Sequence, residues 1–239
     1  MHKVRPGSII LSLFFLFIGS MIGWLAGESV IDGEKADNFL LFIITIPLII
    51  FLFQIYTYKD ATKWLCPQLY FLGSISLTLA WFVIAFTLPI FWSEKVGMYT
   101  KILTTLVSST LCVSNIQFAQ QSFNEKWAQY GQPAFDKQFK TNTTKINWTR
   151  IIRSMKHDFD VHIPGLSKNS SNFVAVIAVG ILVVGHIIRD IHPAFSMLAW
   201  AFSFSVAASW CFHIGAYNFM HAQKVRALEK KYDVRFESA

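Results

Sequence analysis

The densest group of potential metal-binding side chains lies in one short polar stretch. Residues 157–162 read HDFDVH and contain His157, Asp158, Asp160 and His162. Imidazole and carboxylate groups bind divalent transition metals, and alternate side chains share a face if the stretch is extended. Four ligands this close in sequence rarely complete one tetrahedral site. A polar turn is therefore the interpretation that we favour, with a metal site as the alternative.

A second group of titratable side chains lies between the last two apolar stretches of the chain. His186, Arg189, Asp190 and His192 are close together there. The Asp190 carboxylate can accept a hydrogen bond from an imidazole, which would shift the titration of that imidazole. We expect this group to cap a tight turn locally.

The sequence contains no complete catalytic or cofactor motif. It has no nucleophile motif, no phosphate-binding loop and no H-E-x-x-H zinc motif. Cys66, Cys112 and Cys211 fall at a similar depth near His213, which allows a soft-metal site. Free cysteines more often fill space as small apolar residues. We therefore predict no cofactor, and an enzyme would need residues that converge from separate helices.

Six apolar stretches must position these side chains. About 20 apolar residues are needed to carry a helix across the hydrocarbon core of a bilayer. The stretches cover residues 8–26, 39–56, 69–92, 98–117, 173–191 and 194–217. The sequence therefore predicts an all-α fold, a polytopic membrane helix bundle with six transmembrane helices and a small cytoplasmic helical loop.

The basic residues predict how the bundle is oriented. With the N-terminus inside, 17 of the 21 Lys and Arg residues lie on the cytoplasmic side and 4 lie outside. Cytoplasmic segments retain Lys and Arg, so both termini should be cytoplasmic. The net charge of +7 then fits attraction to the anionic inner leaflet, and we expect no nucleic-acid partner. The compact chain suggests a bacterial inner membrane.

Four segments follow from this topology. They are the first four spans (1–121), a basic cytoplasmic loop (122–172), the last two spans (173–217) and a cytoplasmic C-terminal helix or tail (218–239). In the loop, we expect the fourth span to continue to about residue 130, where Gly131 and Pro133 should stop it. A second helical piece is predicted at 146–157.

Small residues at four-residue spacing predict where helices approach closely. Packing within the bundle is the interpretation that we favour, and an interface with another subunit is the alternative. The candidate residues are Gly19, Gly23 and Gly27 in the first span and Ala199, Ser203 and Ala207 in the sixth.

The fourth span is the least apolar, with Thr104, Ser108 and Asn115 near one stripe. Such a helix should face protein or water. Hydroxyl groups contribute modest bonds between helices, so a buried helix is favoured, and a polar pathway is the alternative. The scarcity of ionisable groups inside the spans argues against a proton pump or an ion-coupled transporter.

Two basic groups are candidates for contact with a partner or with lipid. They are Arg150, Arg153 and Lys156 in the loop and Lys224, Arg226 and Lys230 in the C-terminal segment. We predict a non-enzymatic membrane subunit of a multi-protein assembly, or a homo-oligomer, that docks partners through these residues. A channel or transporter subunit with a pathway along the fourth helix is the alternative, and a membrane enzyme or metal protein comes third.

Overall fold

The computed structural model describes residues 6–28, 31, 34–94, 96–140, 144–157, 160–189 and 191–237. The chain is 84% helical and these residues include no β-strand, which confirms the all-α prediction. The long helices are α1 (Pro6–Glu28), α2 (Glu34–Ala61), α3 (Leu65–Ala85), α5 (Met98–Lys126), α8 (Lys168–Ile187) and α9 (Pro193–Tyr232). The short elements are α4 (Pro89–Trp92), the π-helix η1 (Trp127–Gly131), α6 (Gln132–Phe139) and α7 (Trp148–Met155).

Six helical segments among the described residues are long and apolar enough to cross a membrane. Large apolar side chains on their outer faces are exposed, including Phe17, Leu41, Leu103 and Val176. Contact with lipid would remove this apolar surface from water, which is favourable by about 25 cal/mol per Å². These features indicate an integral membrane protein.

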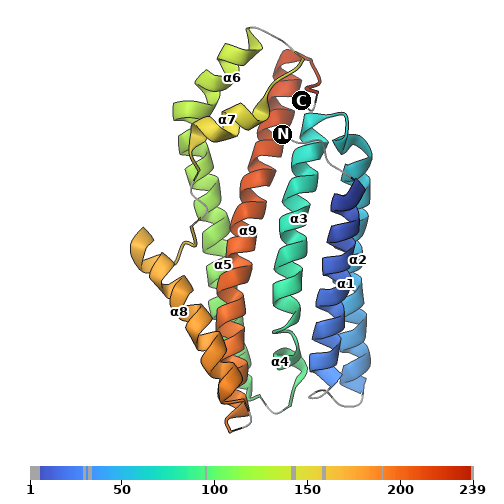
Figure 1. Cartoon of the computed structure of the whole chain (residues 1–239), viewed down its shortest axis with the longest axis vertical. Coiled ribbons are helices and arrows are strands. Elements are labelled where there is room, and N and C mark those ends of the chain that lie inside the picture. Colours follow the sequence, from blue (N-terminus) through green and yellow to red (C-terminus); the bar gives the residue numbers. More distant parts are fainter. Residues whose placement is uncertain are drawn as a thin grey trace.

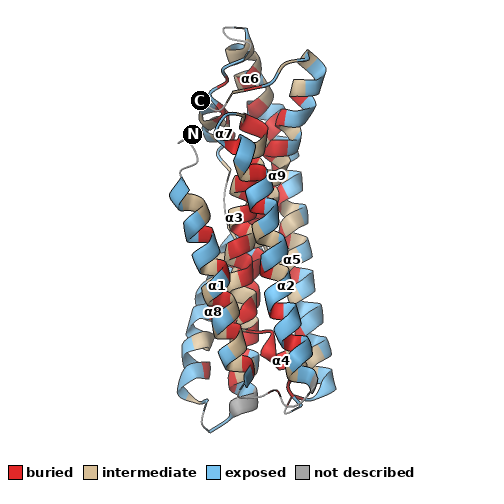
Figure 2. Ribbon diagram, turned by 90° about the vertical axis from the view of Figure 1, so that its right-hand side faces the viewer, coloured by how far each residue is buried: buried red, intermediate tan, exposed pale blue. Residues whose placement is uncertain are grey.

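Helices α3 and α9 form the centre of the bundle. Figure 1 shows them side by side, with α1 and α2 on one flank and α5 and α8 on the other. About half of the apolar window of α3 (56%) and of α9 (50%) is buried, against 17 to 22% for the four outer helices. Buried residues accordingly follow α3 and α9 in Figure 2.

The third span differs from its predicted extent of 69–92. Helix α3 ends at Ala85, and α4 begins after a turn. Pro89 explains the break because proline has no N–H to donate to the carbonyl of Ala85, four residues earlier. Pro89 instead begins α4, where a helix needs no such donor.

The predicted stop at Gly131 and Pro133 is wrong. The helix of the fourth span runs without interruption from residue 98 to residue 139. A π turn absorbs the proline: the N–H of Gln132 donates to the carbonyl of Trp127, five residues earlier. This wider turn lets the chain pass a residue that has no donor and whose ring crowds a regular α-helix.

The extended ends of α5 and α9 carry a compact head. We define the head as η1, α6, α7, the last turns of α9 and residues 233–237 (Figure 1). The largest side chains of its buried core are aromatic, and the rings of Trp127 and Trp148 stack at a centroid distance of 5.7 Å. The chain end closes the head on α3, because the N–H of Leu65 donates to the carbonyl of Phe236. The C-terminal segment therefore belongs to the folded core.

Candidate functional site at the junction of spans and head

Helix α9 carries three buried aromatic side chains on one face where it leaves the bundle. His213, Tyr217 and His221 follow at intervals of four residues, and each is at most 1% exposed. The chain after α7 brings His157 onto this face. Its ring stacks on Tyr217 with centroids 3.6 Å apart, and its Nε2 lies 2.9 Å from Nε2 of His213.

The contact between His157 and His213 constrains protonation. Two ring nitrogens at hydrogen-bond distance require that one donates and the other accepts. Nδ1 of His157 also lies 3.3 Å from the hydroxyl of Ser122 on α5. If both rings carried a proton on each nitrogen, two cationic rings would face each other, neither Nε2 could accept, and the hydrogen bond would be lost. The pair is therefore a contact that acid should break.

His221 is fully buried between α9 and α7. Nε1 of Trp148 donates to Nδ1 of His221 over 3.2 Å, so the proton of a neutral His221 ring lies on Nε2. That Nε2 has no hydrogen-bond partner within the described part of the chain. Tyr217 and Phe123 contact the ring edge to face, at 4.6 and 4.8 Å. This apolar enclosure favours the neutral ring, and His221 joins α9 to α7.

The described members of the predicted metal-binding group, His157, Asp160 and His162, are not gathered at one point. Asp160 accepts hydrogen bonds from Lys168 and Asn172, whereas the His162 ring stacks on Phe118. Asp158 lies outside the described residues. Within the parts of the chain that are described, no three His, Cys, Asp or Glu residues form a group that could hold a metal ion.

Asp160 fastens the chain at the start of α8. The hydrogen bond from Lys168 is the largest influence on its carboxyl group and lowers the pKa, while partial burial opposes this shift. The hydrogen bond from Asn172 lowers the pKa further. The carboxylate is therefore charged at neutral pH and holds the segment before α8 to the first turns of that helix. We call this contact between Asp160 and Lys168 the latch.

The polar residues of α5 make bonds between segments. The hydroxyls of Ser108 and Ser205 on α9 lie 2.5 Å apart. The side chain of Asn115 accepts from the N–H of His162 and donates to the carbonyl of the same residue. Thr104 and Ser108 also border a small hollow of about 210 Å³ between α5 and α9. These bonds favour a packing role for the stripe.

The glycines of α1 lie against neighbouring helices. A Cβ atom added at Gly19 would stand 2.9 Å from Cα of Phe82, and one at Gly27 would stand 2.4 Å from the Phe39 ring. On α9, Ala199 is buried and Ser203 donates to the carbonyl of Ala178 on α8 over 2.6 Å. Ala207 is partly buried. The small residues therefore contact helices of the same chain.

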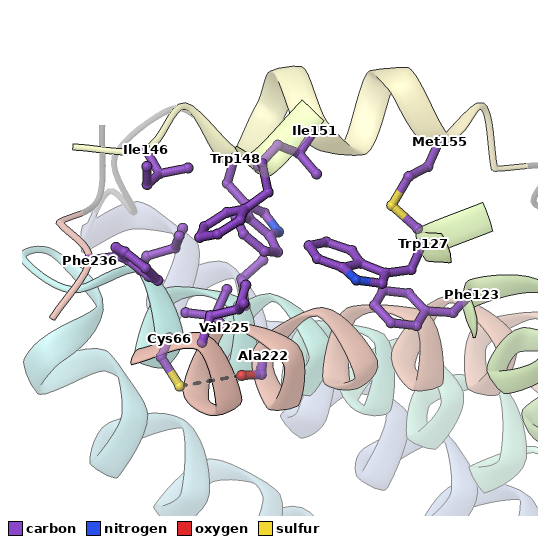
Figure 3. Packing of buried hydrophobic residues seen from close by; sticks show 14 of the residues in the cluster. Cys66, Phe123, Trp127, Ile146, Trp148, Ile151, Met155, Ala222, Val225 and Phe236 are labelled. Carbon is purple, nitrogen blue, oxygen red and sulfur yellow. Dashed lines mark hydrogen bonds between the residues drawn. The ribbon is translucent and has the colours of Figure 1, made fainter. Parts of the chain in front are cut away.

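The three cysteines are free thiols. Cys66 contacts the carbonyl of Ala222, at an S···O distance of 3.6 Å (Figure 3). At the end of the bundle opposite the head, the ring of His186 stacks on Trp200, while Asp190 lies outside the described residues. His192 is exposed.

Helix α7 presents two different faces. Trp148, Ile151 and Met155 point into the head core, as Figure 3 shows, and none is more than 1% exposed. Arg150 and Arg153 lie on the opposite face and are exposed. Because protein covers the apolar face, α7 cannot insert that face into the lipid headgroup layer.

The other basic candidates surround the same head. Lys156 ends α7 in a left-handed conformation and is exposed. Lys224 lies over the Trp127 ring, with its Nζ 5.0 Å from the centroid. Arg226 and Lys230 are exposed on the last turns of α9. The head therefore displays positive charge on more than one side.

Sequence reasoning missed Tyr217 and His221 as members of a cluster. Their spacing from His213 was a readable signal, since residues four apart share a helix face. The approach of His157 had no local signal because it depends on the fold of the loop. Comparisons with protein-family models, curated proteins and solved structures find no match to this chain.

Proposed function

We propose that this chain is a non-enzymatic inner-membrane subunit of a multi-protein assembly in a bacterium, with both termini in the cytoplasm. In this proposal, the head docks a partner protein that presents an acidic surface. The observation that carries the proposal is the two-faced α7. Its apolar residues fix it in the head core, and its basic residues face outward.

The position of the head supports a protein partner. Helix α9 has 40 residues, which corresponds to about 60 Å, whereas the hydrocarbon core of a bilayer is about 30 Å thick. Its cytoplasmic turns and the head therefore extend well beyond the hydrocarbon. A basic surface held there can meet a soluble domain or the cytoplasmic part of another subunit.

Positive charge converges beside α7. Nζ of Lys126 donates to the carbonyl of Lys156 over 2.7 Å, which brings a further cation to the end of this helix. Arg150 and Arg153 are one turn apart on the same side. Complementary charge steers association and selects the partner. An acidic partner surface is therefore the match for this face.

The proposal is tested by comparing two double charge reversals in the head. Arg150→Glu with Arg153→Glu changes the basic face of α7. Lys137→Glu with Lys140→Glu changes the net charge by the same amount, on an exposed residue of α6 and on the exposed residue that follows this helix. After mild-detergent purification from native membranes, we expect the first variant to lose co-purifying chains and the second to keep them.

Two outcomes would contradict the proposal. One is that no other chain co-purifies with the wild type, and the other is that both variants keep the same partners. Release from anionic vesicles without any change in protein partners would show that the basic face contacts lipid instead.

A further inference from the structure

A cavity with charged walls lies where the apolar helices meet the head. It has a volume of about 320 Å³, within the range of about 300 to 1,000 Å³ that is typical of small-molecule sites. Its walls come from the end of α2, the start of α3, the last turns of α9 and the segment after α9 (Figure 1). Both signs of charge line it, Arg226 and Arg235 together with Asp60 and Glu229.

The cavity lies at the level that lipid headgroups would occupy. Residues 38–58 of α2 include no charged side chain, and they extend over about 30 Å by the rise of an α-helix. This length matches the hydrocarbon core of a bilayer, which is about 30 Å thick. Asp60 comes just after this stretch and lines the cavity, as does Tyr56, which is 79% exposed. The cavity therefore borders lipid where hydrocarbon gives way to headgroups.

An aromatic strip leads from the cavity toward the hydrocarbon. Tyr70 of α3 lines the cavity, and its ring lies 6.0 Å from that of Phe219 on α9, measured between centroids. The ring of Phe219 lies 6.4 Å from that of Phe53 on α2. Phe53 precedes Tyr56 by about one helical turn, and Phe219 precedes Arg226 by about two. The strip therefore lies deeper in the bundle than the charged groups, where an acyl chain can pack against it.

The charged groups are held in place without pairing with one another. Cζ of Arg235 lies 5.0 Å from the centroid of the Trp64 ring, and Oε1 of Glu229 accepts a hydrogen bond from the N–H of Phe236. Among the described residues, neither arginine that lines the cavity forms an ion pair with Asp60 or Glu229. The cavity thus offers cationic and anionic groups that do not neutralise each other by direct contact.

We infer that this cavity binds the headgroup of phosphatidylethanolamine, with the phosphate at the two arginines and the primary ammonium at the two carboxylates. Guanidinium groups donate to phosphate oxygens, and an ammonium group has three N–H bonds to donate to carboxylates. A headgroup with negative charge alone would meet the two carboxylates unfavourably. The quaternary ammonium of phosphatidylcholine has no N–H to donate. This inference rests on insertion in the membrane and does not depend on the docking function of the head.

Native mass spectrometry of the full chain in detergent tests the site. The delipidated protein is titrated separately with dioleoyl lipids that differ only in the headgroup: phosphatidylethanolamine, phosphatidylcholine and phosphatidylglycerol. We expect one tightly bound phosphatidylethanolamine per chain. The other two lipids should bind about tenfold more weakly, because each lacks the hydrogen bonds from an ammonium group to the carboxylates.

Two substitutions separate the two halves of the headgroup. Asp60→Asn should lower the affinity for phosphatidylethanolamine to that for phosphatidylcholine, whereas Arg226→Gln should weaken the binding of all three lipids, which share the phosphate. Both side chains are exposed, so neither change disturbs the core. Asp233→Asn and Lys230→Gln are the matched controls. They remove the same charges from exposed residues of the head that do not line the cavity, and they should bind lipid as the wild type does.

Three results would overturn the inference. They are equal binding of phosphatidylethanolamine and phosphatidylcholine by the wild type, an undiminished preference in Asp60→Asn, and an equal loss of binding in the control variants. Free phosphoethanolamine, which has the headgroup without the chains, should not compete at the concentration of the lipid. Competition at that concentration would also overturn the inference, because a soluble zwitterion would then suffice.

Discussion

Gly23 of α1 lies against Ala85, the last residue of α3: a Cβ atom added at Gly23 would stand 2.8 Å from the carbonyl oxygen of Ala85. The same atom would lie 2.5 Å from Cδ1 of Ile43 on α2. One glycine thus sets the approach of three helices. The contact involves backbone at Ala85, which cannot move aside as a flexible side chain can.

Replacing Gly23 with leucine should therefore destabilise the bundle. We expect the free energy of unfolding to fall by about 1 to 3 kcal/mol, the usual effect of overpacking. Gly180→Leu is a matched control, because no atom lies within 4 Å of a Cβ built at Gly180 on α8. Thermal unfolding in detergent measures both variants. Equal stability of the two would show that α1 is not held at Gly23.

Acid should loosen the segment that carries His157. An imidazole ordinarily gains a proton below about pH 6.5, and a second proton would break the contact with His213. The unfolded chain binds these protons freely, so this contribution to stability is present at neutral pH and is lost as the pH falls. After correction for the intrinsic pH dependence of amide exchange, the hydrogen exchange of residues 160–163 should accelerate as the pH falls from about 7.5 to 5.5.

The His157→Phe variant tests the source of that acceleration. Phenylalanine keeps a ring against Tyr217 but has no nitrogen, so the pH dependence of exchange should decrease. His192→Phe is the control because His192 is exposed at the end opposite the head. An equal response to pH in both variants would place the sensitivity elsewhere.

The latch between Asp160 and Lys168 should fail at a lower pH. The hydrogen bond from Lys168 lowers the pKa of Asp160 below its ordinary value of about 3.9. The stabilisation is therefore present above about pH 4 and is lost as the pH falls through the lower folded value. Asp160→Asn should cost at most about 1 kcal/mol, because the pair is partly exposed. Urea unfolding at pH 7, with and without added salt, measures this difference in the free energy of unfolding. If Asp160→Asn is as stable as the wild type, the segment before α8 is held by the hydrogen bonds of Asn172 or Asn115 instead.

Hydropathy located the six long helices because each contains a long run of apolar residues, whether these face the bundle interior or its outer surface. Proline had to be read with its surroundings: Pro89 ends a helix, whereas Pro133 does not, since a π turn precedes it. No local sequence pattern predicts the π turn before Pro133. The pairing of His157 with His213 joins residues 56 positions apart, which depends on how the whole loop folds.

The proposed orientation of the bundle rests on charge alone and can be measured directly. In a background without cysteine, Tyr99→Cys at the start of α5 should react with an impermeant thiol reagent added to sealed cells. Lys230→Cys near the end of α9 should react only after permeabilisation. Both residues are exposed, so access is set by the membrane. The reverse pattern would place the head outside and remove the basis for cytoplasmic docking.

Ser108→Leu separates the docking proposal from a polar pathway. Leucine cannot bond to Ser205, and the loss of a hydrogen bond between helices costs about 0.6 kcal/mol on average. If the protein is a docking subunit, this variant should be slightly less stable and should keep its partners. Val113→Leu, at an exposed position of α5, controls for added bulk.

Conductance in a planar bilayer tests the alternative. If the wild type conducts and Ser108→Leu abolishes the current while assembly is unchanged, the polar stripe of α5 lines a pathway. The reason is that an apolar side chain narrows and dewets a pore. We expect no such current, since the bonds of Ser108 and Asn115 hold α5 to its neighbours.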